Sequence, residues 1–135
     1  PSVYVDTSFL YSLIDDGDPR HYEASQLYEQ YDGDLVLSSY VLAETVSLIT
    51  KRFSKHHSMA AGRWIQESNR TTVLHPDIAD FESAWTLFTE RPDSDYDLVD
   101  ALSVTLMRQQ GLDTAFSLDM HFAQLGFTVR PGQGT

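Results

Sequence analysis

Four acidic side chains lie where a parallel sheet is expected to bind a ligand. Asp6 ends one short apolar run (SVYVD), Asp119 follows a second (TAFSL), and Glu44 and Asp100 lie near the starts of segments with helical spacing. Open parallel sheets bind ligands beyond the carboxyl ends of their strands, near the point where the strand order reverses. We therefore expect these four acids, from distant parts of the chain, to converge on one edge of the sheet.

Carboxylates that converge in this way need a compensating cation. Two carboxylates about 4 Å apart repel by roughly 4 kcal/mol at an effective dielectric near 20, so a larger cluster would take up protons or separate. All-oxygen ligation suits hard divalent ions such as Mg²⁺ or Mn²⁺. The pattern predicts metal-assisted hydrolysis of a phosphodiester, which would leave 5′-phosphate and 3′-hydroxyl ends.

Each acid also has a purely structural interpretation. Asp6 is a good N-cap for a helix that begins at the next residue, and Asp119 could cap a short final helix. Asp97 and Asp100 have the spacing of a capping box, which favours a cap role for Asp97. Asp100 and Glu44 lie in apolar stretches, where an uncompensated charge is unfavourable, so the structural interpretation is weaker for these two.

Short apolar runs alternate along the chain with longer segments of helical periodicity. The predicted strands are 2–6, 35–37, 71–74, 114–118 and 127–130. The predicted helices are 9–14, 24–31, a third capped by Ser38 or Ser39 and reaching Phe53, 59–65, a fifth that starts at Pro76-Asp77, and 98–110. The sixth helix is apolar nearly all round, so we expect it to pack deep against the sheet. This order predicts a three-layer α/β fold with a central, mainly parallel sheet.

Length and composition predict one soluble domain spanning residues 1–135, with a frayed tail at 131–135. The chain is 41% hydrophobic, has no cysteine and contains no apolar run of the roughly 20 residues that a membrane span needs. No signal-like segment leads it, so we expect a cytoplasmic protein without disulfides or thiolate metal sites.

The formal net charge of −11 seems to argue against a nucleic-acid partner, because phosphate contacts normally need a basic face. The placement of the acids matters more than their number, since the predicted metal site itself uses four of them. The remaining excess is mostly aspartate, with 14 Asp against 6 Glu in the chain, and only two of the nine cationic residues are lysine. We interpret this excess as adaptation to high salt.

A basic stretch and two aromatic pairs allow two interpretations each. The basic stretch either steers RNA toward the acids or forms a solvated helix face; its candidate RNA contacts are Lys51, Arg52, Lys55 and Arg63. The aromatic pairs, Tyr28 with Tyr31 and Trp85 with Phe88, predict core or dimer packing.

The segments VDTSFL, LAETV, DLVDALSV and SLDMHF, in this order and at these spacings, resemble the PIN-domain ribonucleases, particularly the VapC-type toxins of toxin–antitoxin pairs. The resemblance covers almost the whole chain. It implies that the metal-binding acids are Asp6, Glu44, Asp100 and Asp119. It also implies that the Ser8 hydroxyl supports the first acid or a metal-bound water, and it places Ser117 at the family's Thr or Ser position before the fourth acid.

The same resemblance implies a five-stranded parallel sheet, RNA cleavage that needs Mg²⁺ or Mn²⁺, a homodimer, and an antitoxin whose basic tail enters the acidic groove. Two positions depart from the family pattern. Asp97 replaces a small hydroxyl residue, so it is either an extra site acid or a helix cap. Met120 and His121 stand where an Arg-Asp-like pair is frequent.

Three alternatives stay open at this point. A phospho-acceptor signalling domain has similar size and alternation, but it needs an aspartate after the third strand and a late lysine. Here that strand ends Leu74-His75-Pro76, and no lysine follows Lys55. A catalytically silent PIN-like binding module and a housekeeping RNA-processing nuclease of the same fold would carry the same motifs.

Overall fold

The computed structural model describes residues 1–132 and gathers five short strands into one sheet. The strands are β1 (Ser2–Val5), β2 (Asp34–Ser38), β3 (Thr71–Leu74), β4 (Thr114–Ser117) and β5 (Thr128–Pro131). Their order across the sheet is β3-β2-β1-β4-β5, and every neighbouring pair is parallel. The predicted α/β fold with a five-stranded parallel sheet is therefore confirmed.

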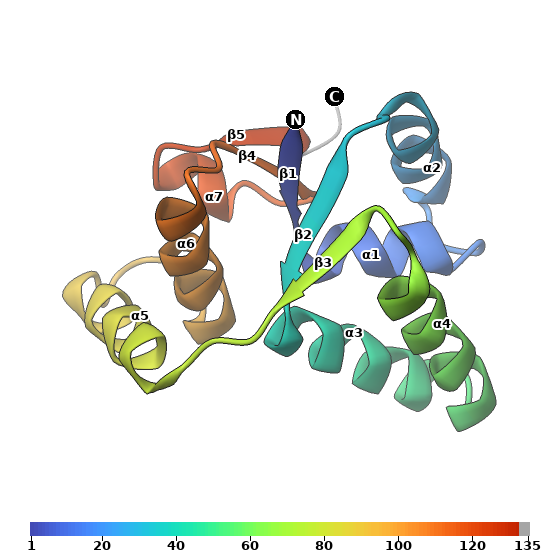
Figure 1. Cartoon of the computed structure of the whole chain (residues 1–135), viewed down its shortest axis with the longest axis horizontal. Coiled ribbons are helices and arrows are strands. Elements are labelled where there is room, and N and C mark those ends of the chain that lie inside the picture. Colours follow the sequence, from blue (N-terminus) through green and yellow to red (C-terminus); the bar gives the residue numbers. More distant parts are fainter. Residues whose placement is uncertain (133–135) are drawn as a thin grey trace.

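The helices cover the sheet on both sides. They are α1 (Thr7–Ile14), α2 (His21–Gln30), α3 (Ser39–Arg52), α4 (Lys55–Glu67), α5 (Ile78–Glu90), α6 (Leu98–Gln110) and α7 (His121–Gln124). Figure 1 shows α5 and α6 on one side of β1, β2 and β3, and α1, α2 and α4 on the other. Helix α3 continues from the end of β2 and packs against both α1 and α4.

Local sequence signals determine where several helices begin and end. The Ser38 hydroxyl accepts a hydrogen bond from the Val41 amide at 3.0 Å, so Ser38 rather than Ser39 caps α3. Gly111 ends α6 in the left-handed conformation, with φ of 67°. As its all-round apolar pattern predicts, most of α6 is buried, with Ala101, Val104 and Met107 fully enclosed.

The strand order reverses between β1 and β4. The chain runs outward from β1 through β2 to β3, then returns to place β4 on the other side of β1. Asp6 directly follows β1, and its amide donates to the Phe116 carbonyl of β4 at 3.0 Å. The carboxyl ends of these two strands therefore form the switch point at which α/β sheets bind ligands.

One expectation about the end of the chain is wrong. Pro131 belongs to β5 and the Gly132 amide donates to the Ser117 carbonyl at 3.0 Å, so these two residues are ordered by pairing with β4 rather than frayed; the rest of the predicted tail, 133–135, lies outside the described residues. On α5, Ile78 is 79% exposed and Trp85 52% exposed, whereas Phe88 packs against the core. The predicted core packing is therefore present for Phe88, and dimer packing of Trp85 stays a prediction.

Candidate active site

Asp6 is buried at the switch point and is held by hydroxyl groups. Its Oδ2 accepts hydrogen bonds from the hydroxyls of Ser8 at 2.8 Å and Ser117 at 3.0 Å. Asp6 occupies the N-cap position of α1 but makes no side-chain capping bond. The helix-cap interpretation of Asp6 is therefore wrong, and both serines predicted to support the site contact this carboxylate.

Asp100 lies in the first turn of α6 and is only 7% exposed. Its Oδ2 accepts the Asp97 amide at 3.1 Å and lies 2.9 Å from Nδ1 of His121. One turn further along α6, the Ser103 hydroxyl is 2.7 Å from the buried Tyr4 hydroxyl of β1. This bond fixes α6 against the central strand and so holds Asp100 near Asp6.

Asp119 and His121 complete the group from the loop after β4. Oδ1 of Asp119 accepts the His121 amide at 3.0 Å, and the Asp119 amide donates to the Ser117 hydroxyl at 3.3 Å. Met120, not Asp119, is the N-cap residue of α7. The His121 ring lies between two acids, because its Nδ1 is also 3.6 Å from Asp119 Oδ1.

Glu44 is placed differently from the other three acids. It lies on the exposed side of α3, because Val41, Thr45 and Ile49 turn toward the core. The expectation that this carboxylate has apolar surroundings is therefore wrong. Its contact with the group is a hydrogen bond from the hydroxyl of Thr7, the residue that follows Asp6.

The buried acids disfavour one another's charge. Burial, reinforced by the charge of Asp119, raises the pKa of Asp6 from 3.8 to about 6, although the hydrogen bonds from Ser8 and Ser117 act in the opposite direction. Burial also raises the pKa of Asp100, reinforced by the charge of Asp6. Burial disfavours the charged His121 ring, but Asp119 and Asp100 outweigh this and raise the pKa of His121.

These acids have the donor chemistry of a divalent cation site, although they are not gathered around a common point. Within residues 1–132, no three His, Asp or Glu side chains are arranged so that they could hold a metal ion. Asp100 is paired with His121 and Glu44 with Thr7. Two buried carboxylates with raised pKa values are nevertheless the oxygen donors that Mg²⁺ or Mn²⁺ prefers, so the donor set fits such an ion.

Asp97 is a helix cap. Its Oδ1 accepts the Asp100 amide at 2.8 Å, and Asp100 Oδ2 accepts the Asp97 amide in return, so the predicted capping box is present. We expect Asp97→Ser to keep wild-type stability and activity, and Asp97→Ala to lower the free energy of unfolding by about 1 kcal/mol. Urea unfolding and cleavage rates measure the two effects. A loss of activity in the Ser variant without a loss of stability would instead make Asp97 a site acid.

Arg52 alone among the four basic candidates lines a hollow beside the acids. That hollow, of about 480 Å³, also contains Thr7 and Ser8. The other three candidates are exposed on α3 and α4 and do not line it: Lys51, Lys55 and Arg63.

Several contacts of the site could not be found from the sequence. Arg20 donates to the Leu118 carbonyl at 2.9 Å and to the Gly132 carbonyl, and so anchors the loop that carries Asp119. These partners lie about a hundred positions away, and no local signal links them. For His121 a weak signal exists, its place two residues after a predicted site acid.

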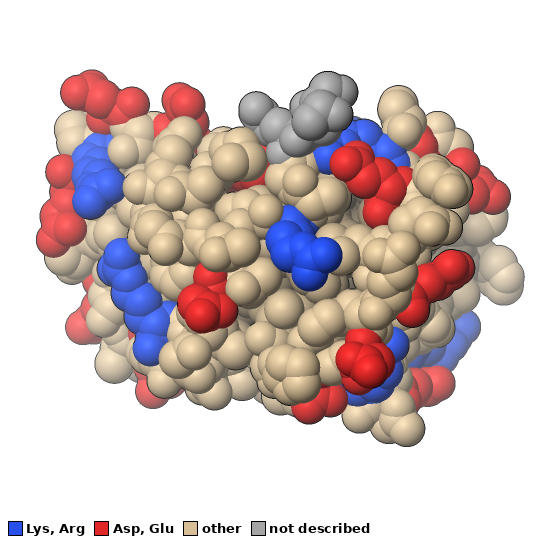
Figure 2. All heavy atoms as spheres, turned by 90° about the horizontal axis from the view of Figure 1, so that it is seen from above, with Lys and Arg blue, Asp and Glu red and all other residues tan. Residues whose placement is uncertain are grey.

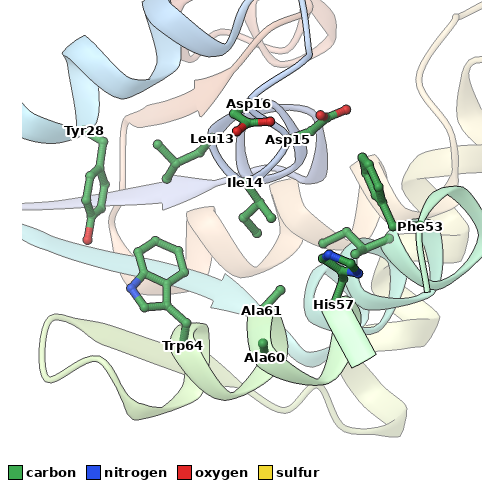
Figure 3. A pocket seen from close by; sticks show the side chains of 11 residues that line it. Leu13, Ile14, Asp15, Asp16, Tyr28, Phe53, His57, Ala60, Ala61 and Trp64 are labelled. Carbon is green, nitrogen blue, oxygen red and sulfur yellow. The ribbon is translucent and has the colours of Figure 1, made fainter. Parts of the chain in front are cut away.

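A larger hollow, of about 580 Å³, lies away from the acid group, among α1, α2, α3 and α4. Figure 3 shows Tyr28 and Trp64 toward one side of it, Phe53 and His57 toward the other, and Ile14 between. Its only carboxylates are those of Asp15 and Asp16, at the end of α1. It is mainly apolar and contains none of the four predicted metal-binding acids, so it is a second surface feature rather than part of the site.

The chain is similar to known proteins over almost its whole length. The family model described as PIN domain matches residues 3–128. A 23S rRNA-specific endonuclease of Mycobacterium tuberculosis, VapC20, is 34% identical over 96% of this chain and 98% of its own. Its crystal structure, described as a Sarcin-Ricin loop cleaving toxin, superposes with a TM-score of 0.88 over 93% of this chain and 96% of that one. A toxin–antitoxin complex from Klebsiella pneumoniae shares the fold, with a TM-score of 0.70 at 18% identity over 98% and 99% of the two chains.

Proposed function

The chain belongs to the PIN-domain family, and on that premise we propose that it is a Mg²⁺- or Mn²⁺-dependent endoribonuclease. The observation that carries the proposal is the group formed by Asp6, Asp100 and Asp119 at the switch point of the sheet. The names of its relatives support the substrate class, since one is a 23S rRNA-specific endonuclease and another, 28% identical over 96% of this chain, is the ribonuclease VapC26.

We assign the parts of the site as follows. Asp6 and Asp100 would hold the cation, with Asp119 and Glu44 completing its acidic surroundings. When bound, the cation would supply positive charge to the phosphodiester and acidify an attacking water. Ser8 and Ser117 orient Asp6 through their hydroxyls. His121 holds a proton between Asp100 and Asp119, and so reduces their repulsion when no cation is bound.

Incubation of the purified protein with ribosomal RNA, with and without MgCl₂, tests this function. We expect discrete fragments with 5′-phosphate and 3′-hydroxyl ends in the presence of Mg²⁺, because hydrolysis by an activated water leaves those ends. A protein that binds RNA but never cuts it would instead be a silent binding module of the same fold.

We further propose that the protein is the toxin of a cytoplasmic toxin–antitoxin pair and that its antitoxin has a basic tail. The complexes among structural neighbours support a protein partner. A basic tail complements the acidic site, where Asp6 and Asp100 repel each other when both are charged. Co-expression with the product of a short neighbouring reading frame should yield a stable complex in which cleavage of RNA is blocked.

We also propose a homodimer formed through α5. Ile78 and Trp85 on this helix are among the most exposed large apolar side chains of the described residues, and a second copy would remove them from water. Light scattering should give twice the mass of the chain for the wild type. Replacement of both residues by serine should give the mass of the monomer.

Adaptation to high salt is the last part of the proposal. Figure 2 shows acidic side chains spread around the visible face and mixed with basic ones, so the acidity there is not confined to one binding patch. Because salt screens repulsion among charges of one sign, we expect the melting temperature to rise between low and molar KCl. A melting temperature that does not change with KCl would contradict this interpretation.

A further inference from the structure

The hollow of about 480 Å³ beside the acids has not yet been given a role. It lies between α1, the start of α2 and the last two turns of α3, and its walls include Tyr11, Leu48 and Arg52. Its volume is within the range of small-molecule and nucleotide sites. None of the functions proposed above accounts for it.

Some of the residues that line this hollow also contact the acids of the site. Thr7 and Ser8 line it, and their hydroxyls donate to Glu44 and Asp6. Leu118, which directly precedes Asp119, lines it as well. A chain bound in the hollow would therefore lie next to Asp6 and Glu44.

One face of α3 runs from the acids along the hollow. Glu44, Leu48 and Arg52 are spaced by four residues, which places them on the same side of a helix. Glu44 receives the Thr7 hydroxyl at the acidic end, and Arg52 lies about 12 Å further along the helix axis. The hollow thus has at one side the two hydroxyl residues that contact Glu44 and Asp6, and at another the guanidinium of Arg52.

Arg52 can bind a ligand in the hollow, whereas the guanidinium of Arg20, the other arginine that lines it, is already hydrogen-bonded within the protein. The Arg20 guanidinium donates to Glu23, Leu118 and Gly132. Arg52 is exposed, and its guanidinium carbon lies 4.7 Å from the centre of the Tyr11 ring, which supports it from one side.

The acids near Arg52 do not take up its guanidinium. Asp18 lines the hollow, but its Oδ1 accepts the Ser12 hydroxyl at 2.8 Å and the Arg20 amide at 2.9 Å. Asp15 accepts the Tyr11 hydroxyl at 2.6 Å. Both carboxylates favour the charged form of Arg52 and raise its pKa, after the larger effect of Tyr11. Tyr11 therefore takes part of the guanidinium, and its remaining N–H donors are available to an incoming phosphate.

From this arrangement we propose that the hollow binds the nucleotide next to the bond that is cut, and that Arg52 binds its phosphate. This inference rests on the proposed endoribonuclease function. It adds the path of the bound RNA strand over the protein, from the acids along α3 to Arg52. A guanidinium suits this role, because it binds phosphate oxygens through paired N–H donors.

Cleavage kinetics on a 23S ribosomal RNA transcript test the assignment with Arg52→Ala, Arg52→Lys and the control Arg108→Ala. Arg108 is exposed near the far end of α6, about 12 Å along its axis from Asp100. We expect Arg52→Ala to raise KM about tenfold with kcat nearly unchanged, and to reduce the salt dependence of log KM by about 0.7. The KM of Arg52→Lys should lie between those of Arg52→Ala and the wild type. Arg108→Ala should have the KM of the wild type.

A binding experiment that needs no cleavage separates this inference from the proposed function. Fluorescence anisotropy with labelled dodecauridylate and MgCl₂ compares Asp6→Asn with the double variant Asp6→Asn/Arg52→Ala. We expect about tenfold weaker binding in the double variant, even if the wild type cuts no RNA. Equal affinity of the two proteins, or an equal loss when Arg108→Ala replaces Arg52→Ala, would overturn the role of Arg52.

Discussion

Replacement of Asp6 by asparagine is expected to abolish RNA cleavage and at the same time to stabilise the folded protein. Cleavage should fall by a factor on the order of 10³, as when a group that stabilises transition-state charge is removed. Stability should rise, because the buried Asp6 has its pKa raised from 3.8 to about 6 and is therefore unfavourably charged at neutral pH. A site that is selected for function rather than stability has this combination of effects.

The size of the stabilisation follows from the pKa of Asp6. Each pKa unit corresponds to about 1.4 kcal/mol, and the asparagine amide fits the two hydroxyl donors less well than a carboxylate does. We therefore expect the free energy of unfolding at pH 8 without divalent ions to rise by about 1–3 kcal/mol. Thermal melts and initial cleavage rates measure both quantities on the same samples.

Two further variants make this test specific. Asp100→Asn should also abolish cleavage, since Asp100 is the second buried acid. Asp93→Asn removes the same charge from an exposed position between α5 and α6, and it should change neither quantity. Undiminished cleavage in both Asp6→Asn and Asp100→Asn would refute the assignment of the site, and a destabilised Asp6→Asn would contradict the electrostatic argument.

Divalent ions are expected to reverse the pH dependence of stability. With EDTA, the melting temperature should fall as the pH rises from 5 to 8. Asp6 titrates near 3.8 in the unfolded chain and near 6 in the folded protein, so the folded state binds more protons over this interval. Its stabilising contribution is complete below pH 3.8 and is lost as the pH passes 6. The raised pKa values of Asp100 and His121 act in the same direction.

With Mg²⁺ or Mn²⁺, the ionised acids become ligands and the trend should invert. An ion present at a hundred times its dissociation constant stabilises the folded state by about 2.7 kcal/mol, and the effect should be largest at pH 8, where protons no longer compete. EDTA should abolish cleavage, and added Mg²⁺ should restore it. Asp6→Asn is the control, because it should show a smaller decline with pH, from Asp100 and His121 alone, and less stabilisation by Mg²⁺.

Equal melting curves of the wild type with EDTA and with Mg²⁺ at pH 8 would contradict the metal site directly. This outcome would leave the fold unaffected. It would mean that a metal ion does not balance the charge of the acids at the switch point.

The sequence predicted those features of the fold that depend on local periodicity. Each of the five strands was expected within a residue or two of its observed bounds, because short apolar runs between helical segments are typical of a buried parallel sheet. The capping box of Asp97 and Asp100 and the end of α6 at Gly111 were also expected, since caps depend on residues three or four positions apart. Predictions of this kind need no knowledge of the tertiary structure.

The acids themselves could be selected from the sequence, but their environments could not. A motif does not show that Asp6 accepts two hydroxyls while Glu44 faces solvent, because Ser117 is 111 positions from Asp6 and the exposed side of α3 is decided by what packs against it. The exposure of Ile78 and Trp85 on α5 could not be predicted from the sequence for the same reason. A helix buries whichever face meets the sheet, and its own periodicity does not show which of two apolar faces that will be.

The sequence by itself thus determined the elements, their parallel arrangement and the acids worth testing, because these depend on periodicity and residue type. Only the tertiary structure decided the strand order that places β1 beside β4, the burial that raises the pKa of Asp6, the pairing of His121 with Asp100, and the hollow that ends at Arg52. These features arise from contacts between segments far apart in the chain. Their energies depend on burial and distance, which exist only once the chain has folded.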